Sequence, residues 1–319
     1  MISFCKLGLN FEDRLIFHVL QGLPKLIFTF FYGIVRAFLP WDWLPHKDVR
    51  EQTVLITGAA SGVGRLLAVK FASLGCKLVL WDINNLGNFE TAEMCKKYDV
   101  QVSAYTVDIT NTEAVEKTAS LVLNKFGSVD ILINNAGIVT GKKLLDCPDE
   151  TFDLTMNVNA NSLFYVTKRF LPKMIANDRG HIVVVASMAG RIGVNGLVDY
   201  SASKFAACGF TEALHAELTS TNSNVKTTLI CPYYVNTGMF EGVKSSFPNL
   251  LPILEPEYVR DQIVEAVLTD THIVYMPRFC YFTMVIKELF SVYTGDAIAE
   301  ICGVHQQMAG FKGRKQIAT

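Results

Sequence analysis

A glycine-rich turn between an apolar segment and a helical one constrains the fold of this chain more than any other feature. Residues 53–57 (TVLIT) are apolar and β-branched, which is typical of a buried parallel strand. The turn 58–64 (GAASGVG) follows directly, and apolar residues at helical spacing then continue to Gly75. This order directs backbone N–H groups and a helix N-terminus at one point, where a pyrophosphate can bind. The pattern predicts a dinucleotide site, against the alternative of a tight turn without a ligand.

Strand and helix patterns alternate from Gln52 to about Met276, which predicts a doubly wound α/β domain with a parallel sheet over residues 51–276. The 319 residues are 50% hydrophobic and 18% charged, which suits one large core. The net charge of −1, without a basic stripe, argues against nucleic-acid binding. The eight cysteines lack the spacing of metal ligands and lie mostly in apolar segments. We therefore expect buried free thiols, no disulfide framework and no metal site.

An acidic residue ends the second predicted strand, residues 77–81 (KLVLW). Asp82 at this position can accept hydrogen bonds from the adenosine ribose hydroxyls and would repel a 2′-phosphate, which favours NAD over NADP. Arg65 weakens this preference, since its guanidinium could reach a phosphate. The alternative is a solvated aspartate at a strand end.

A tyrosine and a lysine four residues apart, Tyr200 and Lys204, lie on one face of a predicted helix. An ammonium close to a phenol favours the phenolate, so we expect the Tyr200 pKa to fall from its usual value of about 10. Tyr200 could then act as a general base. The Ser187 hydroxyl could hold a substrate oxygen while the proton leaves. Alone, this spacing occurs by chance in many helices.

Together these motifs resemble those of the short-chain dehydrogenase/reductase family over about residues 50–270. The resemblance adds Asp108, which bonds the adenine amino group in that family, and residues 134–137 (NNAG), which line the cofactor. It also adds Asn159, which holds a water behind the catalytic lysine. The implied catalytic residues are Asn159, Ser187, Tyr200 and Lys204. The implied NAD-binding residues are Gly58, Ser61, Gly62, Val63, Gly64, Asp82, Asp108, Ile109, Asn135, Ala136, Gly137, Tyr200, Lys204, Val235 and Thr237.

One position departs from the family pattern. The Pro-Gly that often follows the sixth strand is replaced here by Pro232-Tyr233. Val235 and Thr237 still match positions that contact the nicotinamide carboxamide. The departure therefore concerns the wall of the nicotinamide pocket and the shape of the substrate, and leaves the hydride chemistry unaffected.

Residues 1–50 differ in character from the predicted domain. Between residues 14 and 39 the polar side chains recur every three or four positions, on one narrow helical stripe. They are Arg14, His18, Gln21, Lys25, Thr29, Tyr32 and Arg36. Pro24 should kink or break the helix. We expect an in-plane membrane anchor, followed by Trp41 and Trp43 at the membrane boundary. The alternatives are a single span, a layer packed over the domain or, less favoured, a cleaved signal peptide.

The lid and the C-terminal region are also apolar. Residues 237–256 are expected to form a lid over an apolar substrate, or else a packed loop. The start of residues 271–293 predicts the last strand. The rest of the extension, residues 277–319, predicts an apolar helix that either lies on the same membrane and flanks the substrate mouth or covers the sheet edge. Its basic tail, Lys312, Arg314 and Lys315, suits anionic headgroups or solvent.

Four segments tighten the resemblance to the membrane-bound 16C subfamily, which includes retinol dehydrogenases and 17-beta-hydroxysteroid dehydrogenases. They are residues 138–143, 146–150, 237–242 and 251–256. The resemblance implies oxidation of all-trans-retinol to all-trans-retinaldehyde with NAD. It places the protein at the endoplasmic reticulum membrane or lipid droplets, with the catalytic domain facing the cytosol. A steroid dehydrogenase and a catalytically idle lipid-droplet protein are the alternatives. Dimers are common in the family, often through the helix that carries the tyrosine and lysine, so a homodimer is compatible with the resemblance.

Overall fold

The computed structural model describes the chain apart from residues 1–10, 290–291, 302, 304–306, 309 and 314–319. It divides into two compact units, residues 1–46 and 47–319, and each is described by itself.

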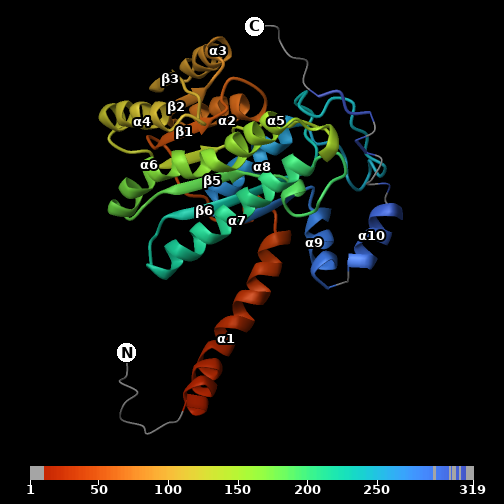
Figure 1. The fold of residues 1–319 in the computed structure, drawn as a ribbon. Helices are drawn as coiled ribbons and strands as arrows, with labels where there is room; N and C mark the ends of the chain where they lie inside the picture. Colours follow the sequence, from red (N-terminus) through yellow and green to blue (C-terminus); the bar gives the residue numbers. More distant parts are fainter. Residues whose placement is uncertain (1–10, 290–291, 302, 304–306, 309, 314–319) are drawn as a thin grey trace. The chain divides into compact units, whose positions relative to one another are not determined.

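The larger unit is built on a seven-stranded sheet in which every described strand is parallel to its neighbours (Figure 1). The strands are β1 (Thr53–Thr57), β2 (Lys77–Asp82), β3 (Val102–Thr106), β4 (Ile131–Asn134), β5 (His181–Val185), β6 (Lys226–Pro232) and β7 (Ile273–Met276). Their order is β3-β2-β1-β4-β5-β6-β7, so the direction of winding reverses between β1 and β4. Such a switch point is where parallel sheets bind ligands. The predicted doubly wound α/β fold is confirmed.

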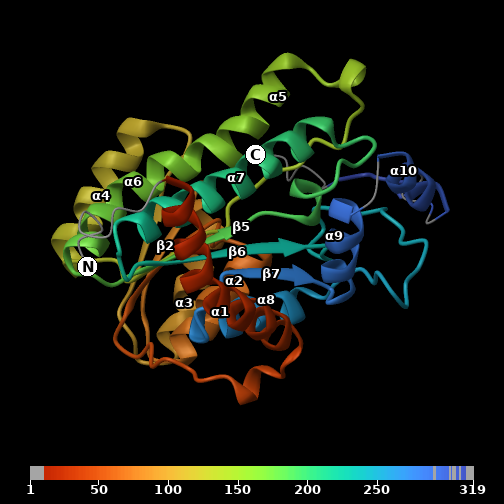
Figure 2. The same cartoon turned by 90° about the horizontal axis from the view of Figure 1, so that it is seen from below.

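Helices cover both faces of the sheet, as Figure 2 shows. One face carries α2 (Gly62–Ser73), α3 (Asn85–Lys96) and α8 (Pro256–Leu268). The other carries α4 (Thr112–Phe126), α5 (Asp149–Met156), α6 (Ser162–Ala176) and α7 (Val198–Ser220). Short turns η3 (Leu144–Asp146), η4 (Asn157–Asn161) and η5 (Met188–Gly190) lie between them. On this second face Trp81 of β2 packs against Phe170 of α6, with ring centroids 5.7 Å apart and both side chains fully buried. Burying such a side chain contributes about 1.5–3 kcal/mol.

Asparagine side chains set where two of the helices begin. The Asn84 side chain accepts a hydrogen bond from Gly87 N–H at 3.1 Å at the start of α3. Asn111 accepts one from Ala114 N–H at 3.0 Å at the start of α4. Each such cap stabilises the helix by about 1 kcal/mol, so α3 and α4 begin at defined residues.

The smaller unit contains one long helix, α1 (Phe11–Phe38), and a short turn, η2 (Trp41–Trp43). Pro24 was predicted to kink or break the helix, and the break does not occur: α1 continues through Pro24, because a proline removes one helical hydrogen bond while the neighbouring turns keep theirs. Side chains from Arg14 to Gln21 lie outside the described part, so half of the polar stripe is not described. In the other half, Thr29 donates to the Lys25 carbonyl at 2.8 Å and Arg36 donates to the Tyr32 hydroxyl at 2.8 Å.

The surface of α1 outside this stripe is apolar and exposed in this unit, as at Phe28, Phe30 and Phe31. Among the residues that the structure describes, no helix combines the length and apolar character needed to cross a membrane.

The C-terminal extension forms α9 (Phe279–Leu289) and α10 (Val292–Ile301) after the predicted last strand. Cys280 and Met284 of α9 join the hydrophobic core, and the Tyr281 hydroxyl donates to the Ile273 carbonyl of β7 at 3.1 Å. Phe282, Val285 and Leu289 of the same helix are exposed. α9 therefore covers the sheet edge with one face and presents an apolar stripe with the other. Of the basic tail, Arg314 and Lys315 lie outside the described residues.

Candidate active site

The glycine turn connects β1 to α2 at the carboxyl edge of the sheet. Gly58 and Gly62 have φ of +68° and +56°, in the left-handed region that favours glycine. A Cβ at Gly64 would lie 2.1 Å from the Gly58 carbonyl oxygen, so α2 begins in direct contact with the loop. This close packing leaves backbone N–H groups at the N-terminus of α2 available, and the cradle fits a pyrophosphate.

A second loop, after β4, is tied to this turn. The Thr57 hydroxyl accepts hydrogen bonds from the backbone N–H groups of Asn135 and Ala136, both at 3.1 Å. The Asn135 side chain donates to the carbonyls of Thr57 and Gly58 at 3.0 and 3.2 Å. The two predicted cofactor loops therefore form one rigid edge at the switch point of the sheet.

Asp82 supports the glycine turn as well as ending β2. Its carboxylate accepts hydrogen bonds from Ala60 N–H at 2.9 Å and Asn84 N–H at 2.8 Å. The Arg65 guanidinium is held by the carbonyl of Ala60 at 2.6 Å and the carboxylate of Glu90 at 2.9 Å. Arg65 is thus engaged in holding the turn to α3. The acidic Asp82 is the charged group at the strand end, which favours ribose hydroxyls over a 2′-phosphate.

We expect Asp82→Ala to reduce the preference for NAD over NADP by about tenfold or more, since a hydrogen bond to a charged group contributes about 1.5–3 kcal/mol. The measurement is the ratio of kcat/KM for the two cofactors. The variant should also melt at a lower temperature, because Ala60 and Asn84 lose their acceptor. Glu93→Gln, which changes an exposed carboxylate of α3 that pairs with Lys96, is the control, with an unchanged ratio. An unaltered ratio in Asp82→Ala would exclude this role.

The remaining cofactor candidates lie along the same edge. Asp108 is exposed just beyond β3, and its carboxylate accepts hydrogen bonds from the Thr110 N–H and hydroxyl at 2.9 and 2.7 Å. Thr237 lies over the glycine turn, because a Cβ at Gly62 would be 3.4 Å from its methyl carbon. The others occupy the start of α2, the residue after Asp108 and the loop after β6: Ser61, Val63, Ile109 and Val235.

Three elements bring the four catalytic candidates together. Tyr200 and Lys204 lie in α7, Ser187 follows β5, Asn159 lies in the π-helical turn η4, and all four are buried. Ser187 and Tyr200 share a side-chain hydrogen bond. The Lys204 Nζ lies 5.7 Å from the Tyr200 ring centroid and donates to the Val185 carbonyl at 2.9 Å. Serine, tyrosine and lysine therefore form one buried group.

Asn159 connects the loop after β4 to α7. Its Oδ1 accepts from Ile138 N–H at 2.9 Å, and its Nδ2 donates to the Ile138 carbonyl at 2.9 Å and the Ser203 hydroxyl at 3.0 Å. A Cβ at Gly137 would lie 3.3 Å from Asn159 Oδ1 and 3.4 Å from Lys204 Nζ, so glycine leaves room beside both groups. π-Helical turns are frequent at functional sites, and this one directs Asn159 inward.

The expectation that the Tyr200 pKa falls from its usual value is wrong for this structure. Burial raises the pKa of Tyr200 to about 12, although the hydrogen bond with Ser187 acts in the opposite direction. Burial also lowers the pKa of Lys204 to about 8. The charged form of each group loses its hydration, and this loss outweighs the attraction at the observed separation. Helical spacing predicted that the two residues are close, but it carried no information about their burial.

These pKa values predict how the rate depends on pH. Oxidation of an alcohol needs the Tyr200 phenolate, and its pKa of about 12 lies far above neutrality. We therefore expect log kcat/KM for oxidation to rise by about one per pH unit between pH 6 and 8. The rise should flatten above pH 8, where Lys204, with a pKa of about 8, loses its proton. Initial rates at saturating cofactor test this, and a flat profile between pH 6 and 8 would contradict it.

A segment near the C-terminus packs at the site, which sequence analysis missed. We call Gln307, Met308 and residues 310–312 the C-terminal strap. The Tyr233 hydroxyl donates to Gln307 Oε1 at 2.7 Å, and the backbone N–H of Lys312 donates to the Glu241 carbonyl at 2.8 Å. The strap is thereby joined both to the loop after β6 and to the predicted lid.

Phe311 brings the strap into contact with the aromatic group around Tyr200. Its ring centroid lies 6.4 Å from that of Phe240, which lies 5.7 Å from Tyr200 in an edge-to-face arrangement. A Cβ at Gly141, where φ is +70°, would be 1.8 Å from the Phe311 ring. The sequence signals that could have indicated this contact are Gly141 and Phe311. They are 170 positions apart, so no local pattern relates one to the other.

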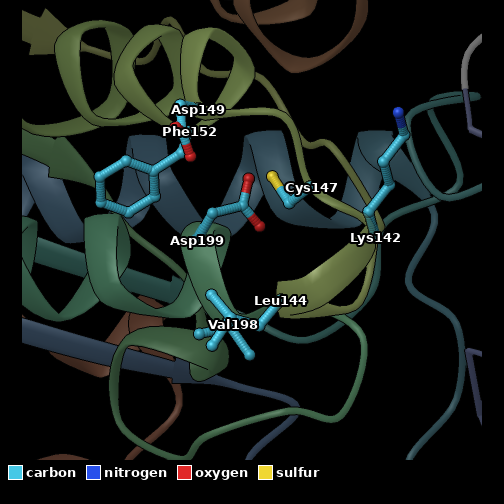
Figure 3. A pocket seen from close by; sticks show the side chains of 7 residues that line it. All are labelled: Lys142, Leu144, Cys147, Asp149, Phe152, Val198 and Asp199. Carbon is cyan, nitrogen blue, oxygen red and sulfur yellow. The ribbon is translucent and has the colours of Figure 1, made fainter.

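A small cavity of about 190 Å³ lies beside the start of α7 (Figure 3). It is lined by Lys142, Leu144, Cys147, Asp149, Phe152, Val198 and Asp199. Asp199 directly precedes Tyr200 and accepts a hydrogen bond from the Thr140 hydroxyl through Oδ2. Thr140 and Thr155 also share a hydrogen bond of 3.0 Å. This network joins the loop after β4 to α5 and to the first turn of α7. It thereby holds the backbone of the helical turn that carries Tyr200.

Comparisons with known proteins agree with this geometry. The short chain dehydrogenase family model matches residues 52–246. Epidermal retinol dehydrogenase 2 of Homo sapiens is 48% identical over 92% of this chain and 95% of its own. The Bos taurus short-chain dehydrogenase/reductase family 16C member 6 is 44% identical over 92% and 93%. A solved short-chain dehydrogenase/reductase from Burkholderia phymatum, in complex with NAD, superposes with a TM-score of 0.68 at 26% identity, covering 76% of this chain and 94% of that one. This chain belongs to the short-chain dehydrogenase/reductase family, within its 16C subfamily.

Proposed function

We propose that this protein is an NAD-dependent retinol dehydrogenase that oxidises all-trans-retinol to all-trans-retinaldehyde at a membrane surface. The observation that carries the proposal is the buried group of Ser187, Tyr200 and Lys204 beside the glycine turn, in a chain 48% identical to a protein named epidermal retinol dehydrogenase 2. The reaction class in this proposal is that of the family, and the proposed substrate is the one in the name of the relative.

Each catalytic candidate has a role in this reaction. NAD, held by the glycine turn, Asp82 and the loop after β4, supplies the acceptor for the hydride that leaves the alcohol carbon. Tyr200 takes the hydroxyl proton as a general base. Ser187, within hydrogen-bonding contact of Tyr200, donates to the substrate oxygen and keeps it against the phenol. Lys204 stabilises the phenolate as it forms, and Asn159 fixes the loop and helix that carry these groups.

The surroundings of Tyr200 suit an apolar alcohol. Phe240 of the lid packs against Tyr200, and Phe311 of the strap packs against Phe240, so the surroundings of the tyrosine are hydrocarbon. Retinol carries one hydroxyl on a long apolar chain. Its burial beside Tyr200 removes apolar surface from water and leaves no second polar group without a hydrogen-bond partner.

Lipid-soluble substrates are delivered from a membrane or droplet, and the exposed apolar side of α1 supports attachment to one. We propose the endoplasmic reticulum membrane or lipid droplets, with the catalytic domain in the cytosol. Exposed Phe164 and Phe205 on α6 and α7 support a homodimer through these helices.

The function is tested with membranes from cells that express the full chain. Retinol or estradiol is supplied with NAD or NADP, and retinaldehyde and estrone are quantified. We expect retinaldehyde with NAD, and at least tenfold lower kcat/KM for estradiol. Faster turnover of estradiol would favour a steroid dehydrogenase. NAD binding without turnover of either alcohol would favour the catalytically idle protein.

A further inference from the structure

Tyr234 is a buried tyrosine at the reaction site for which the proposed mechanism has no role. It follows Tyr233 in the loop after β6. Its side chain is 7% exposed. Its hydroxyl is fully buried and has no hydrogen-bond partner among the residues that the structure describes.

The ring of Tyr234 is held beside the catalytic tyrosine. Phe240 packs edge-to-face against both, with centroid distances of 5.1 Å to Tyr234 and 5.7 Å to Tyr200. Tyr233 packs edge-to-face on the other side at 4.6 Å. Tyr200 and Tyr234 belong to one hydrophobic cluster, so the unpaired hydroxyl lies in the apolar surroundings of the reacting phenol.

Two features make this hydroxyl suited to donate a hydrogen bond. Burial and the charge of a Tyr200 phenolate both raise the pKa of Tyr234, which keeps it a neutral donor while Tyr200 ionises. An unpaired buried hydroxyl costs about 1–3 kcal/mol, and this cost is relieved when a ligand supplies an acceptor. The neighbouring hydroxyl of Tyr233 is different, because it is already paired with Gln307 at 2.7 Å.

We propose that Tyr234 donates a hydrogen bond to the reacting oxygen of the substrate, as a third hydroxyl beside Ser187 and Tyr200. The inference rests on the proposed function, because it needs an alcohol as substrate. When the proton leaves, negative charge develops on this oxygen, and a charge-assisted hydrogen bond is stronger than one to the neutral alcohol. Tyr234 therefore stabilises the transition state more than the bound substrate, and its loss should appear mainly in kcat.

The test is Tyr234→Phe, compared with Tyr281→Phe as the matched control, on the full chain in membranes. Kinetics use whichever alcohol the wild type oxidises, retinol or estradiol. For Tyr234→Phe we expect kcat to fall about 10- to 100-fold, the equivalent of a charge-assisted hydrogen bond, with little change in KM for the alcohol or in NAD affinity. Its melting temperature should be equal to or above that of the wild type, because an unpaired buried group is removed. Tyr281→Phe, which loses a hydroxyl paired with the Ile273 carbonyl at 3.1 Å, should melt at a lower temperature and keep its kcat.

Three results would overturn the inference: wild-type kcat in Tyr234→Phe, a loss of kcat equal in both variants, or a loss that accompanies a lowered melting temperature. The first shows that the hydroxyl makes no contact in the transition state. The other two show that the loop was merely loosened. Failure of retinol as a substrate would count against the proposed function alone, since estradiol kinetics would still decide the role of Tyr234.

Discussion

Tyr200→Phe is expected to lower kcat/KM for alcohol oxidation by at least the ~10²–10⁴-fold typical of general acid–base catalysis, while NAD still binds through the other residues of the predicted cofactor site. The change removes only the hydroxyl that takes the proton and bonds Ser187. The phenylalanine ring can keep the contact with Phe240 at 5.7 Å, so the packing around the strap is retained. The measurement is initial rates of aldehyde formation, with NAD affinity determined separately by fluorescence titration.

A matched control separates chemistry from packing. Tyr281→Phe also removes a tyrosine hydroxyl from a half-buried position, where it donates to the Ile273 carbonyl on the edge strand. This variant should lose about 1 kcal/mol of stability and retain its activity. If Tyr200→Phe kept more than a tenth of the wild-type kcat/KM, Tyr200 would not be the base, and the mechanism would have to be rebuilt around another group.

Gly64→Ala is expected to reduce NAD affinity by about 100-fold or more, because the added methyl group has no room. Its Cβ would lie 2.1 Å from the Gly58 carbonyl oxygen and 2.6 Å from Asn135 Nδ2, so the turn must separate from the start of α2. Overpacking of this kind typically costs 1–3 kcal/mol of folding stability, and here the displaced atoms are those of the predicted pyrophosphate cradle. Titration with NAD and thermal unfolding measure the two effects.

Gly209→Ala is the control for this substitution. Gly209 lies within α7, and a Cβ there meets no described atom within 4 Å. Alanine should raise the stability of this helix by up to about 1 kcal/mol and leave NAD affinity unchanged. Wild-type NAD affinity in Gly64→Ala would mean that the cofactor does not rely on the close packing of the turn.

The sheet was predictable because its signals are local and repeated. Residues 53–57 and 77–81 are continuous apolar runs, and both became strands of the parallel sheet. The glycine turn could be predicted for a related reason: the left-handed backbone at Gly58 and Gly62 favours glycine, so the residue types indicate the turn.

Two expectations about individual residues did not hold. Both depend on the folded surroundings of the residue, which the local sequence pattern does not record. Pro24 was expected to kink or break its helix, and the break did not occur, since α1 continues through Pro24. Lys204 was expected to lower the pKa of Tyr200, yet burial raises that pKa to about 12. A sequence records that two side chains share a helix face; how much water each has lost depends on every element packed around them.

The sequence by itself determined the strand–turn–helix cofactor unit and the alternation of strands and helices along the chain, since each is encoded by residue type and spacing over short distances. The catalytic candidates came as a set from the resemblance to the family. Only the tertiary structure decided what surrounds those candidates. It placed Phe311 of the strap against Phe240, paired Tyr233 with Gln307, and left Tyr234 with an unpaired hydroxyl beside Tyr200. These contacts join residues far apart in the chain, and they form because apolar surface is buried wherever the folded chain brings it together.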